Sequence, residues 1–338
     1  MSELPAKISI GHGSGGKMTR SLIEQLFVRE FASVTADRLS DSYLADIEGL
    51  KLAFTSDSYV VSPLFFPGGD IGKLSVCGTV NDLAVSGAVP LCLSASFIIE
   101  EGFETELLKR IVKSMAAEAL KAGVKIVTGD TKVVNRGKCD KLFISTSGIG
   151  IIEAGNEHIS GAEQIEEGDK IIFSGTPGDH SIAILAARSE FDMQTDIISD
   201  CASLNRMLGT LVKKGGIRFM RDATRGGLAT VLVELARMTG KGIAVEECRI
   251  PVNSAVESVC EVLGFDPLYL ANEGKVLMVV AADMADSIVE SMRSFPEGRQ
   301  SAVIGTIDSD VTGVRLQTLI GGSRTIDMLA SDQLPRIC

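Results

Sequence analysis

The sequence predicts an α/β (α+β) protein built from two layered domains, and three observations support that prediction. A chain of 338 residues is long enough for about two domains, each with its own hydrophobic core. Strand-like and helix-like segments alternate in both halves, which is typical of helices layered on sheets. Between residues 153 and 168 these segments give way to Gly, Glu, Asn and Ser, which we interpret as the domain boundary.

The first half combines strands that end in polar residues with apolar helices. We expect strands at residues 7–10, 50–55, 124–127 and 142–146, and helices at 19–31, 71–86 and 104–122. The helix at 104–122 has apolar residues at helical spacing, and Gly123 stands where a C-terminal cap belongs. The strand at 50–55 runs toward Asp57, which we therefore expect at a strand end. A polar turn at 128–132 is expected after the strand at 124–127.

The second half repeats this layout of strands followed by polar loops. We expect strands at residues 170–173, 217–220 and 276–280, and helices at 181–187 and 228–238. Asp222 lies in the polar turn at 221–227, and Glu273 lies in the loop that precedes the strand at 276–280. We find no internal repeat of solenoid length.

Composition excludes several classes of protein. A net charge of −11 argues against nucleic acid or an anionic membrane as a partner. The seven cysteines form no C-x-x-C pair and have no metal-ligand spacing to a histidine, so a zinc site is not expected. Without a leader-like segment or an apolar run of membrane-spanning length, the sequence predicts a cytoplasmic protein with reduced thiols.

The glycine-rich loop at residues 11–17 fits two nucleotide-binding patterns only in part. It matches G-x-G-x-x-G, but no convincing second strand ends in an acidic residue about 20 residues later. It also matches G-x-x-x-x-G-K, but Met18 replaces the Ser or Thr that holds magnesium in a P-loop. A flexible turn, or a lid whose backbone N–H groups and Lys17 contact phosphates, remains as the alternative.

The chain ends in a cysteine, Cys338, on a polar segment that we expect to be mobile. Chain ends are usually disordered unless something holds them, and a terminal thiol can visit more than one pocket. We expect the nearby Arg336 to favour the thiolate, which is the reactive form of cysteine. The alternative is that Cys338 is incidental, on a frayed end.

Four aspartates lie where side chains from different elements can converge: Asp57, Asp82, Asp130 and Asp222. Carboxylates brought together repel one another, and some would take up protons unless a cation joined them. Mg²⁺ takes hard oxygen ligands, together with phosphate oxygens and water. The pattern therefore indicates a site for Mg²⁺ and phosphate, although any one aspartate alone is more often a turn or cap residue.

Several segments together carry a resemblance that covers essentially the whole chain. They are HGSGG at 12–16, TSDSYVVSPLFFPGGDIGKL at 55–74, CGTVNDLAVSGAVP at 77–90, TGDTKVV at 128–134, SDCA at 199–202, RDATRGG at 221–227, ANEGK at 271–275 and the terminal PRIC. In these motifs the chain resembles the HypE family of hydrogenase maturation factors, which are carbamoyl dehydratases of the PurM-like, AIR synthetase-related superfamily.

The resemblance implies a PurM-like two-domain fold and a homodimer. A glycine-rich arm and helix (1–40) would precede an N-terminal, ATP-binding sheet domain (41–158) through which two copies dimerise. A C-terminal α/β sandwich domain (159–328) would follow, and a mobile tail (329–338) would carry the reactive cysteine. ATP would bind near the dimer interface.

The resemblance also implies the members of the site. Asp57, Asp82 and Asp222 would hold Mg²⁺ and phosphate. Further contacts to the nucleotide would come from Lys17, Asn81, Asp130 and Thr131. The catalytic residues would be Cys338, Lys132 and Glu273, although the last two could instead be structural ion-pair residues.

The implied chemistry begins when a partner carbamoyltransferase, HypF, places a carbamoyl group on Cys338. The thiocarboxamide is then dehydrated with ATP to a thiocyanate, and the cyanide passes to an iron centre held by a HypC–HypD complex during [NiFe]-hydrogenase maturation. The amide oxygen is a poor leaving group, so phosphorylation from ATP lets it leave as phosphate. A base must also remove protons from the amide nitrogen.

Two alternatives remain from the sequence. One is another ATP-using enzyme of the superfamily, such as an AIR or selenophosphate synthetase. Neither of those enzymes needs a terminal thiol, and the selenium enzymes usually carry a reactive residue in the glycine loop, whereas no cysteine precedes Cys77 here. The other alternative is a non-catalytic, nucleotide-dependent scaffold protein.

Overall fold

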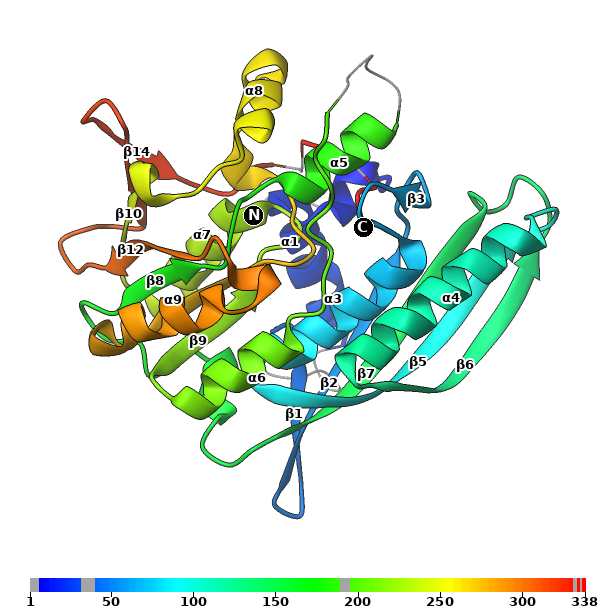
Figure 1. Ribbon diagram of the computed structural model, residues 1–338, viewed down its shortest axis with the longest axis horizontal. Coiled ribbons are helices and arrows are strands. Elements are labelled where there is room, and N and C mark those ends of the chain that lie inside the picture. The colour runs from blue at the N-terminus through cyan, green and yellow to red at the C-terminus, as the bar shows by residue number, and fades with distance from the viewer. Residues whose placement is uncertain (1–5, 32–39, 189–194, 331–332, 335) are drawn as a thin grey trace.

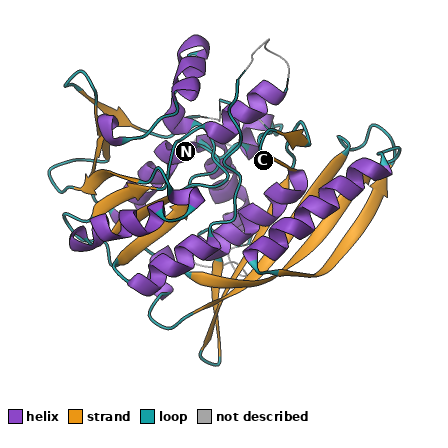
Figure 2. Cartoon of the chain, in the orientation of Figure 1, coloured by secondary structure: helices purple, strands orange, loops and turns teal. Residues whose placement is uncertain are grey.

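Two β-sheets, one formed by each half of the chain, organise the protein, as the computed structural model shows (Figure 1). The structure describes residues 6–31, 40–188, 195–330, 333–334 and 336–338. Helices and strands alternate in both halves (Figure 2), which confirms the predicted α/β class. Within the described residues, no helix is both long and apolar enough to span a membrane.

The first sheet has the strand order β1, β2, β7, β5, β6, in which β5 and β6 run parallel and the other neighbours run antiparallel. Its strands are β1 (Tyr43–Ile47), β2 (Leu50–Tyr59), β5 (Ala88–Glu100), β6 (Lys125–Val134) and β7 (Leu142–Ile152). Helices α3 (Ile71–Val85) and α4 (Thr105–Ala122) pack on one face of this sheet. The predicted cap of α4 is confirmed, because Gly123 adopts a left-handed conformation with φ 77°.

Helix α3 lies between the two halves of the chain, and most of its residues are buried. Asp70 caps its N-terminus, because a carboxylate oxygen accepts the backbone N–H of Gly72 at 2.8 Å and that of Lys73 at 3.2 Å. At its C-terminal end, Ala84 and Val85 pack into the core of the second half. Burial on all sides explains why this helix lacks an amphipathic pattern.

The second sheet has the order β14, β13, β10, β12, β8, β11, β9. Its strands are β8 (Lys170–Phe173), β9 (Ile217–Asp222), β10 (Ile243–Glu246), β11 (Val276–Val280), β12 (Ala302–Ile307), β13 (Val314–Gln317) and β14 (Ser323–Ile326). Helices α6 (Asn205–Lys214) and α9 (Ala285–Arg293) share one of its cores, and α7 (Gly227–Thr239) belongs to another. In contrast, α5 (Asp179–Ala187) and α8 (Ser254–Leu263) pack into the core of the first half.

The N-terminal arm is helical, with α1 (Lys17–Leu22), a π turn (Ile23–Phe27) and α2 (Val28–Glu30). The strand expected at residues 7–10 is wrong. Instead, the backbone N–H of His12 donates to the carbonyl of Ser9 at 3.1 Å, which closes a 3₁₀ turn over Ile10–Gly13, and the backbone N–H of Ser9 donates to Nδ1 of His12 at 3.1 Å. Short elements complete the chain: β3 (Phe65–Phe66), β4 (Gly69–Asp70) and 3₁₀ turns at Glu157–Ser160, Glu247–Arg249, Pro267–Tyr269, Ala282–Met284 and Pro296–Gly298.

Two strands of the first sheet extend beyond their predicted ends. β2 continues to Tyr59, so Asp57 lies inside the strand and not at its end. The turn expected at 128–132 is part of β6, where Asp130 stands opposite Ser96 of β5. This long-range pairing outweighs the turn preference of Gly129 and Asp130. β5 was not predicted from the sequence, because Pro90 and alternating serines interrupt its apolar pattern.

Candidate active site

Three aspartates from different elements converge between the two halves of the chain. Asp57 lies on β2, Asp82 on α3 and Asp222 at the end of β9, and all three line one cavity. Alternate residues of a strand project from the same face, so Thr55 and Tyr59 accompany Asp57 on the face toward α3. The Thr55 hydroxyl donates to Asp82 at 2.6 Å, and the Tyr59 hydroxyl donates to Asp57 at 3.1 Å.

Burial and mutual repulsion raise the pKa values of these carboxyl groups. Burial is the largest cause for each of the three, and the charges of neighbouring acids add to it. The pKa of Asp57 is raised, that of Asp82 lies well above its usual value, and that of Asp222 is raised to about 8. The charge of Arg225 opposes this effect at Asp57. Full ionisation of the cluster therefore calls for additional positive charge.

A cavity of about 1100 Å³ opens onto the three aspartates. Its size suits a nucleotide, because ligand pockets commonly span about 300 to 1000 Å³. The cavity is lined by Gly15, Thr19, Arg20, Ile23, Glu24, Ser40, Asp41, Thr55, Ser56, Asp57, Asp82, Ser160, Gly161, Ala162, Glu163, Ile165, Arg221, Asp222, Thr224, Arg225, Glu234, Arg237, Met238, Thr239 and Lys241. Several of these side chains are cationic, which suits the recognition of phosphate groups.

The last residue of the chain, Cys338, lies on a smaller adjoining cavity. This cavity is lined by Asp57, Ser58, Tyr59, Gly78, Asp82, Asp222, Thr224, Arg225, Glu273 and Cys338. The three aspartates, together with Thr224 and Arg225, also line the larger cavity. A terminal thiol and a space of nucleotide size therefore meet at the same carboxyl groups.

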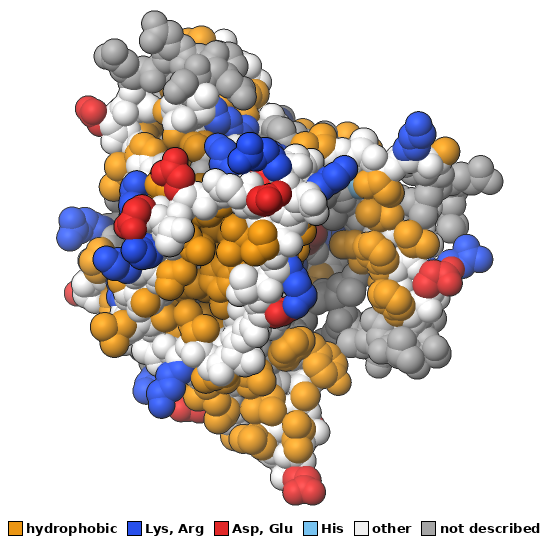
Figure 3. Space-filling view, turned by 90° about the vertical axis from the view of Figure 1, so that its right-hand side faces the viewer, with side chains coloured by type: hydrophobic (Ala, Val, Ile, Leu, Met, Phe, Trp, Pro, Cys, Tyr) orange, Lys and Arg blue, Asp and Glu red, His pale blue; other side chains and the backbone are white. Residues whose placement is uncertain are grey.

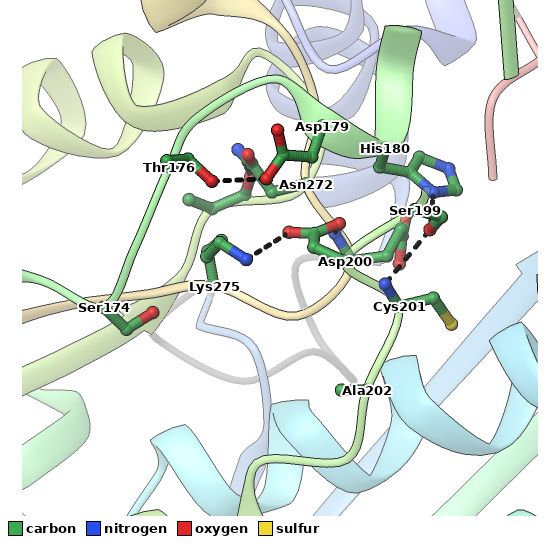
Figure 4. A network of polar contacts seen from close by, with 12 residues as sticks. Ser174, Thr176, Asp179, His180, Ser199, Asp200, Cys201, Ala202, Asn272 and Lys275 are labelled. Carbon is green, nitrogen blue, oxygen red and sulfur yellow. Dashed lines mark hydrogen bonds and ion pairs between the residues drawn. The ribbon is translucent and has the colours of Figure 1, made fainter. Parts of the chain in front are cut away.

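Glu273 is buried beside this thiol and has one carboxylate oxygen, Oε1, without a hydrogen-bond partner in the described part of the chain. Its backbone N–H donates to Oδ1 of Asp200 at 3.0 Å, and Asp200 in turn lies 3.3 Å from the ammonium group of Lys275 (Figure 4). Burial, with the charges of Asp200 and Asp222, raises the pKa of Glu273 well above its usual value. A carboxylate in these surroundings binds a proton strongly, which suits a general base.

The end of the tail is docked against the first half of the chain. Leu334 and Ile337 are buried in the core of that half. The backbone N–H of Val60 donates to a main-chain oxygen of Cys338 at 3.0 Å, and that of Ser62 donates to the carbonyl of Arg336 at 3.2 Å. The docked tail places the thiol of Cys338 in the site. Movement of the tail out of the site stays a prediction.

The base of the tail is held by the glycine-rich loop. The backbone N–H of Lys17 donates to the carbonyl of Leu329 at 3.0 Å, and that of Met18 donates to Ala330 at 3.2 Å. A Cβ on Gly16 would lie 2.8 Å from the Leu329 carbonyl, so the close approach of the two segments requires glycine there. The Lys17 ammonium forms an exposed ion pair with Asp327 at 2.8 Å.

Three of the residues predicted for the site lie apart from the aspartates within one chain. Asp130 and Lys132 form an exposed ion pair at 2.7 Å on β6, and Thr131 lies between them. β6 is at the edge of its sheet, and β5 and β7 separate it from β2, which carries Asp57. A role for these residues at the site thus depends on a second subunit.

Asn81 supports the site without pointing into it. Its side-chain amide donates to the carbonyl of Ala202 at 3.0 Å, and its oxygen accepts the backbone N–H of Leu204 at 2.8 Å. It therefore ties α3 to the loop that follows Cys201. This contact gives Asn81 a structural role next to Asp82.

Sequence reasoning missed Thr55, Tyr59 and Arg225 as members of the site. The period of two along β2 could have indicated the first two, because residues 55, 57 and 59 share a face. Arg225 lies in the RDATRGG segment, and its guanidinium donates to the carbonyl of Gly13 at 3.2 Å. It lines both cavities, beside the carboxyl groups where phosphate charge would gather.

The donor set suits Mg²⁺ only if other ligands complete it. Within the described ranges, no group of three or more His, Cys, Asp or Glu side chains is arranged to hold a metal ion by itself. Mg²⁺ is usually bound by one or two carboxylates together with phosphate oxygens and waters. The carboxyl groups of Asp57 and Asp82, which are half-buried, and that of Asp222, which is buried, lie next to a nucleotide-sized cavity and fit that requirement.

The fold and the site define a two-domain protein of the AIR synthase related class. The family model for the N-terminal domain of AIR synthase related proteins matches residues 39–152, and the model for the C-terminal domain matches residues 166–316. The predicted PurM-like two-domain fold is confirmed.

Among curated proteins, the carbamoyl dehydratase HypE of Rhodobacter capsulatus is 50% identical over 337 residues, which cover 98% of this chain and 98% of that protein. The chain therefore belongs to the carbamoyl dehydratase HypE family, as the resemblance in its motifs predicts.

Solved structures agree with this assignment. A crystal structure of a HypE–HypF complex matches with a TM-score of 0.85 and 47% identity, covering 91% of this chain and 100% of that one. A HypE crystal structure in complex with ATP matches with a TM-score of 0.81 and 44% identity, covering 98% of this chain and 100% of that one.

Proposed function

We propose that this protein uses ATP to dehydrate a carbamoyl group carried on Cys338 to a thiocyanate, as a source of the cyanide ligands of [NiFe]-hydrogenase. The observation that supports this most directly is the meeting of two cavities at one set of aspartates. The larger cavity suits ATP, and the smaller one receives the terminal thiol. A HypE structure in complex with ATP supports ATP as the nucleotide.

The reaction proceeds by phosphorylation followed by elimination. The carbamoyl oxygen attacks the γ-phosphorus, ADP leaves, and the nitrogen gives up one proton. Loss of the second proton from nitrogen then expels phosphate and leaves a C≡N group on the Cys338 sulfur. In sum, ATP becomes ADP and phosphate, and the thiocarboxamide loses the elements of water. Positioning and charge neutralisation at the γ-phosphate are the main contributions of the protein.

Glu273 takes a proton from the substrate nitrogen in this scheme. It lines the cavity of the thiol, is buried, and has a raised pKa. Asp57, Asp82 and Asp222 would hold Mg²⁺ together with the phosphates. The ion would neutralise charge on the transferred phosphoryl group, and Arg225 adds a cationic side chain at the same place.

A homodimer would bring Lys132 to this site from the partner subunit. β6 is an exposed edge strand in which Val127 and Val133 are 59% and 67% exposed, and such edges are usually covered. The side of the molecule that carries β6 also shows broad areas of hydrophobic side chains (Figure 3). The outer face of the sheet, opposite α3, exposes Phe54 and Ile149, which stand opposite each other on β2 and β7. A second copy on this surface would bury them.

The chemistry also requires a donor and an acceptor. HypF would load the carbamoyl group onto Cys338, and the crystal structure of a HypE–HypF complex supports this partner. A HypC–HypD complex would take the cyanide for iron. We place these steps in the cytoplasm, where thiols stay reduced.

Phosphate release tests the proposal. Purified protein with Mg²⁺ and ATP alone should release little phosphate, and addition of HypF with its carbamoyl donor should produce about one phosphate per carbamoyl group dehydrated. Phosphate release that does not respond to carbamoylation would favour another synthetase of the superfamily. ATP binding without any turnover would favour a scaffold protein.

A further inference from the structure

We propose that His180 and Arg188, at the two ends of helix α5, form a latch that holds the last carbonyls of the tail and so sets how much of the time Cys338 stays in the site. The inference deepens the proposed function, on which it rests, because it concerns access to the same thiol. It assigns to α5 a positioning role toward the chain terminus.

His180 holds the carbonyl of Ile337, the residue that precedes Cys338. Nε2 of His180 lies 2.6 Å from this carbonyl oxygen, and Nδ1 lies 2.7 Å from the hydroxyl of Ser199. A carbonyl can only accept, so Nε2 carries the proton and Nδ1 accepts from Ser199 in the neutral ring. Burial lowers the pKa of His180, which keeps the ring neutral.

The orientation of the imidazole ring is fixed from two further directions. Ser199 accepts the backbone N–H of Cys201 at 3.0 Å, so its own hydroxyl proton is directed at Nδ1 (Figure 4). The ring also packs edge to face against Phe66, with centroids 5.5 Å apart. The donor that meets the tail is therefore held in place before the tail arrives.

Arg188 supplies the second contact. It follows the C-terminus of α5, and its Nη2 donates to the carbonyl of Arg336 at 2.8 Å while its Nε donates to the carbonyl of Ser62 at 2.9 Å. The same guanidinium thus joins the tail to the segment that pairs with it. The backbone N–H of Ser62 also donates to the Arg336 carbonyl, so this carbonyl accepts two hydrogen bonds.

These contacts reach only the backbone of the tail. They fix where the terminal residue stops and hold the thiol at the carboxyl cluster, whatever chemical group the sulfur carries. Loading by a partner protein requires the opposite state, with the thiol outside. The strength of the latch therefore sets the balance between a state competent for dehydration and a state competent for loading.

Thiol accessibility in the full-length protein tests the latch without relying on enzyme activity. Iodoacetamide is added to wild type, His180→Phe and His180→Gln, and the alkylation rate of Cys338 is followed by the mass of the C-terminal peptide. Cys248, which is exposed after β10, serves as the reference thiol in the same molecule. Phe fills the ring's space without a donor, whereas Gln keeps an N–H that can reach the carbonyl.

A matched control is His158→Phe. His158 also has Nε2 at hydrogen-bond distance from a backbone carbonyl, 3.0 Å from that of Ile217, but outside the tail. Its loss removes the same kind of bond from the folded protein, so it reports the effect of lowered stability alone. Thermal unfolding of each variant is measured alongside the alkylation rates.

Loss of one hydrogen bond should raise the alkylation rate of Cys338 about fivefold in His180→Phe. His180→Gln should lie closer to wild type, and His158→Phe and the rate at Cys248 should not change. If His180→Phe fails to fold, Arg188→Met should give the same rise. An unchanged rate at Cys338 in a folded His180→Phe, or an equal rise in His158→Phe, would overturn the latch. If the proposed function is wrong but the latch is right, the variants should still show these changes in alkylation rate. The wild-type protein would then form no thiocyanate.

Discussion

The Asp222→Asn substitution isolates the electrostatic cost of gathering three carboxyl groups at one site. Asp222 is buried, and burial with the charges of Asp41 and Asp57 raises its pKa from 3.8 to about 8. The native protein therefore keeps a proton on this carboxyl group at pH values where the unfolded chain has released it. In consequence, the free energy of unfolding falls as pH rises through the window between these two pKa values.

The size of this effect follows from the shift. Each pH unit inside the window costs at most about 1.4 kcal/mol per retained proton. Between about pH 5.5 and about pH 7.5, the wild type without nucleotide should lose about 1 to 3 kcal/mol of stability relative to Asp222→Asn, in which position 222 does not titrate. The variant should also be the more stable protein at the higher pH, while losing ATP turnover.

Equilibrium urea unfolding of both proteins at the two pH values, without nucleotide or divalent cation, provides the measurement. The difference between the two proteins removes contributions from other titrating groups that they share. Parallel dependence of unfolding free energy on pH in wild type and variant would refute the account of a buried, protonated cluster.

Three further predictions concern the reaction and the assembly. Asp82→Asn should reduce Mg²⁺-dependent ATP turnover by about 100-fold or more, and full turnover of this variant with excess chelator would exclude the assigned role. Sedimentation should show a homodimer at micromolar concentration, and a mixture of Lys132→Ala with Cys338→Ser subunits should regain thiocyanate formation if the lysine acts across the interface, whereas no recovery would place it elsewhere. Glu273→Gln should accumulate the carbamoylated tail, because proton removal follows loading, and a normal rate of thiocyanate formation would show that another base acts.

The sequence predicted the fold class and the convergence of four aspartates; Asp57, Asp82 and Asp222 do converge, whereas Asp130 lies apart on the edge strand β6. Asp57 and Asp222 accompany strands with clear apolar runs, and Asp82 lies in an apolar helix where an acid needs a partner. The raised pKa values of all three, for which loss of contact with water is the largest cause, agree with that expectation.

The length of β6 could not be predicted, since it depends on pairing with a strand distant in sequence. Gly129 resembles a turn residue, but in the structure it lets the backbone approach the carbonyl of Ala95, where a Cβ would clash. The place of Lys132 at the edge strand follows from this pairing. A role for Lys132 at the site would need a second subunit, as proposed above, and the pattern of a single sequence does not show one.

The docking of the tail could not be predicted from the sequence pattern either. A polar approach to Cys338 predicts a mobile end, yet Ile337 is buried and backbone groups hold its neighbours. His180 gave no signal of its own, because its role depends on a tertiary contact with a carbonyl 157 residues away in the chain.

The mass of the C-terminal peptide after incubation with ATP, Mg²⁺, HypF and a carbamoyl donor tests the central claim most directly. The account predicts that the peptide ending in Cys338 first gains one carbamoyl group and then loses one water only when ATP is present. Cys338→Ser should fold and bind ATP but show neither change, because a hydroxyl stays protonated and is a weaker nucleophile. Carbamoyl or cyanide found on an internal cysteine of an active Cys338→Ser variant would contradict the account.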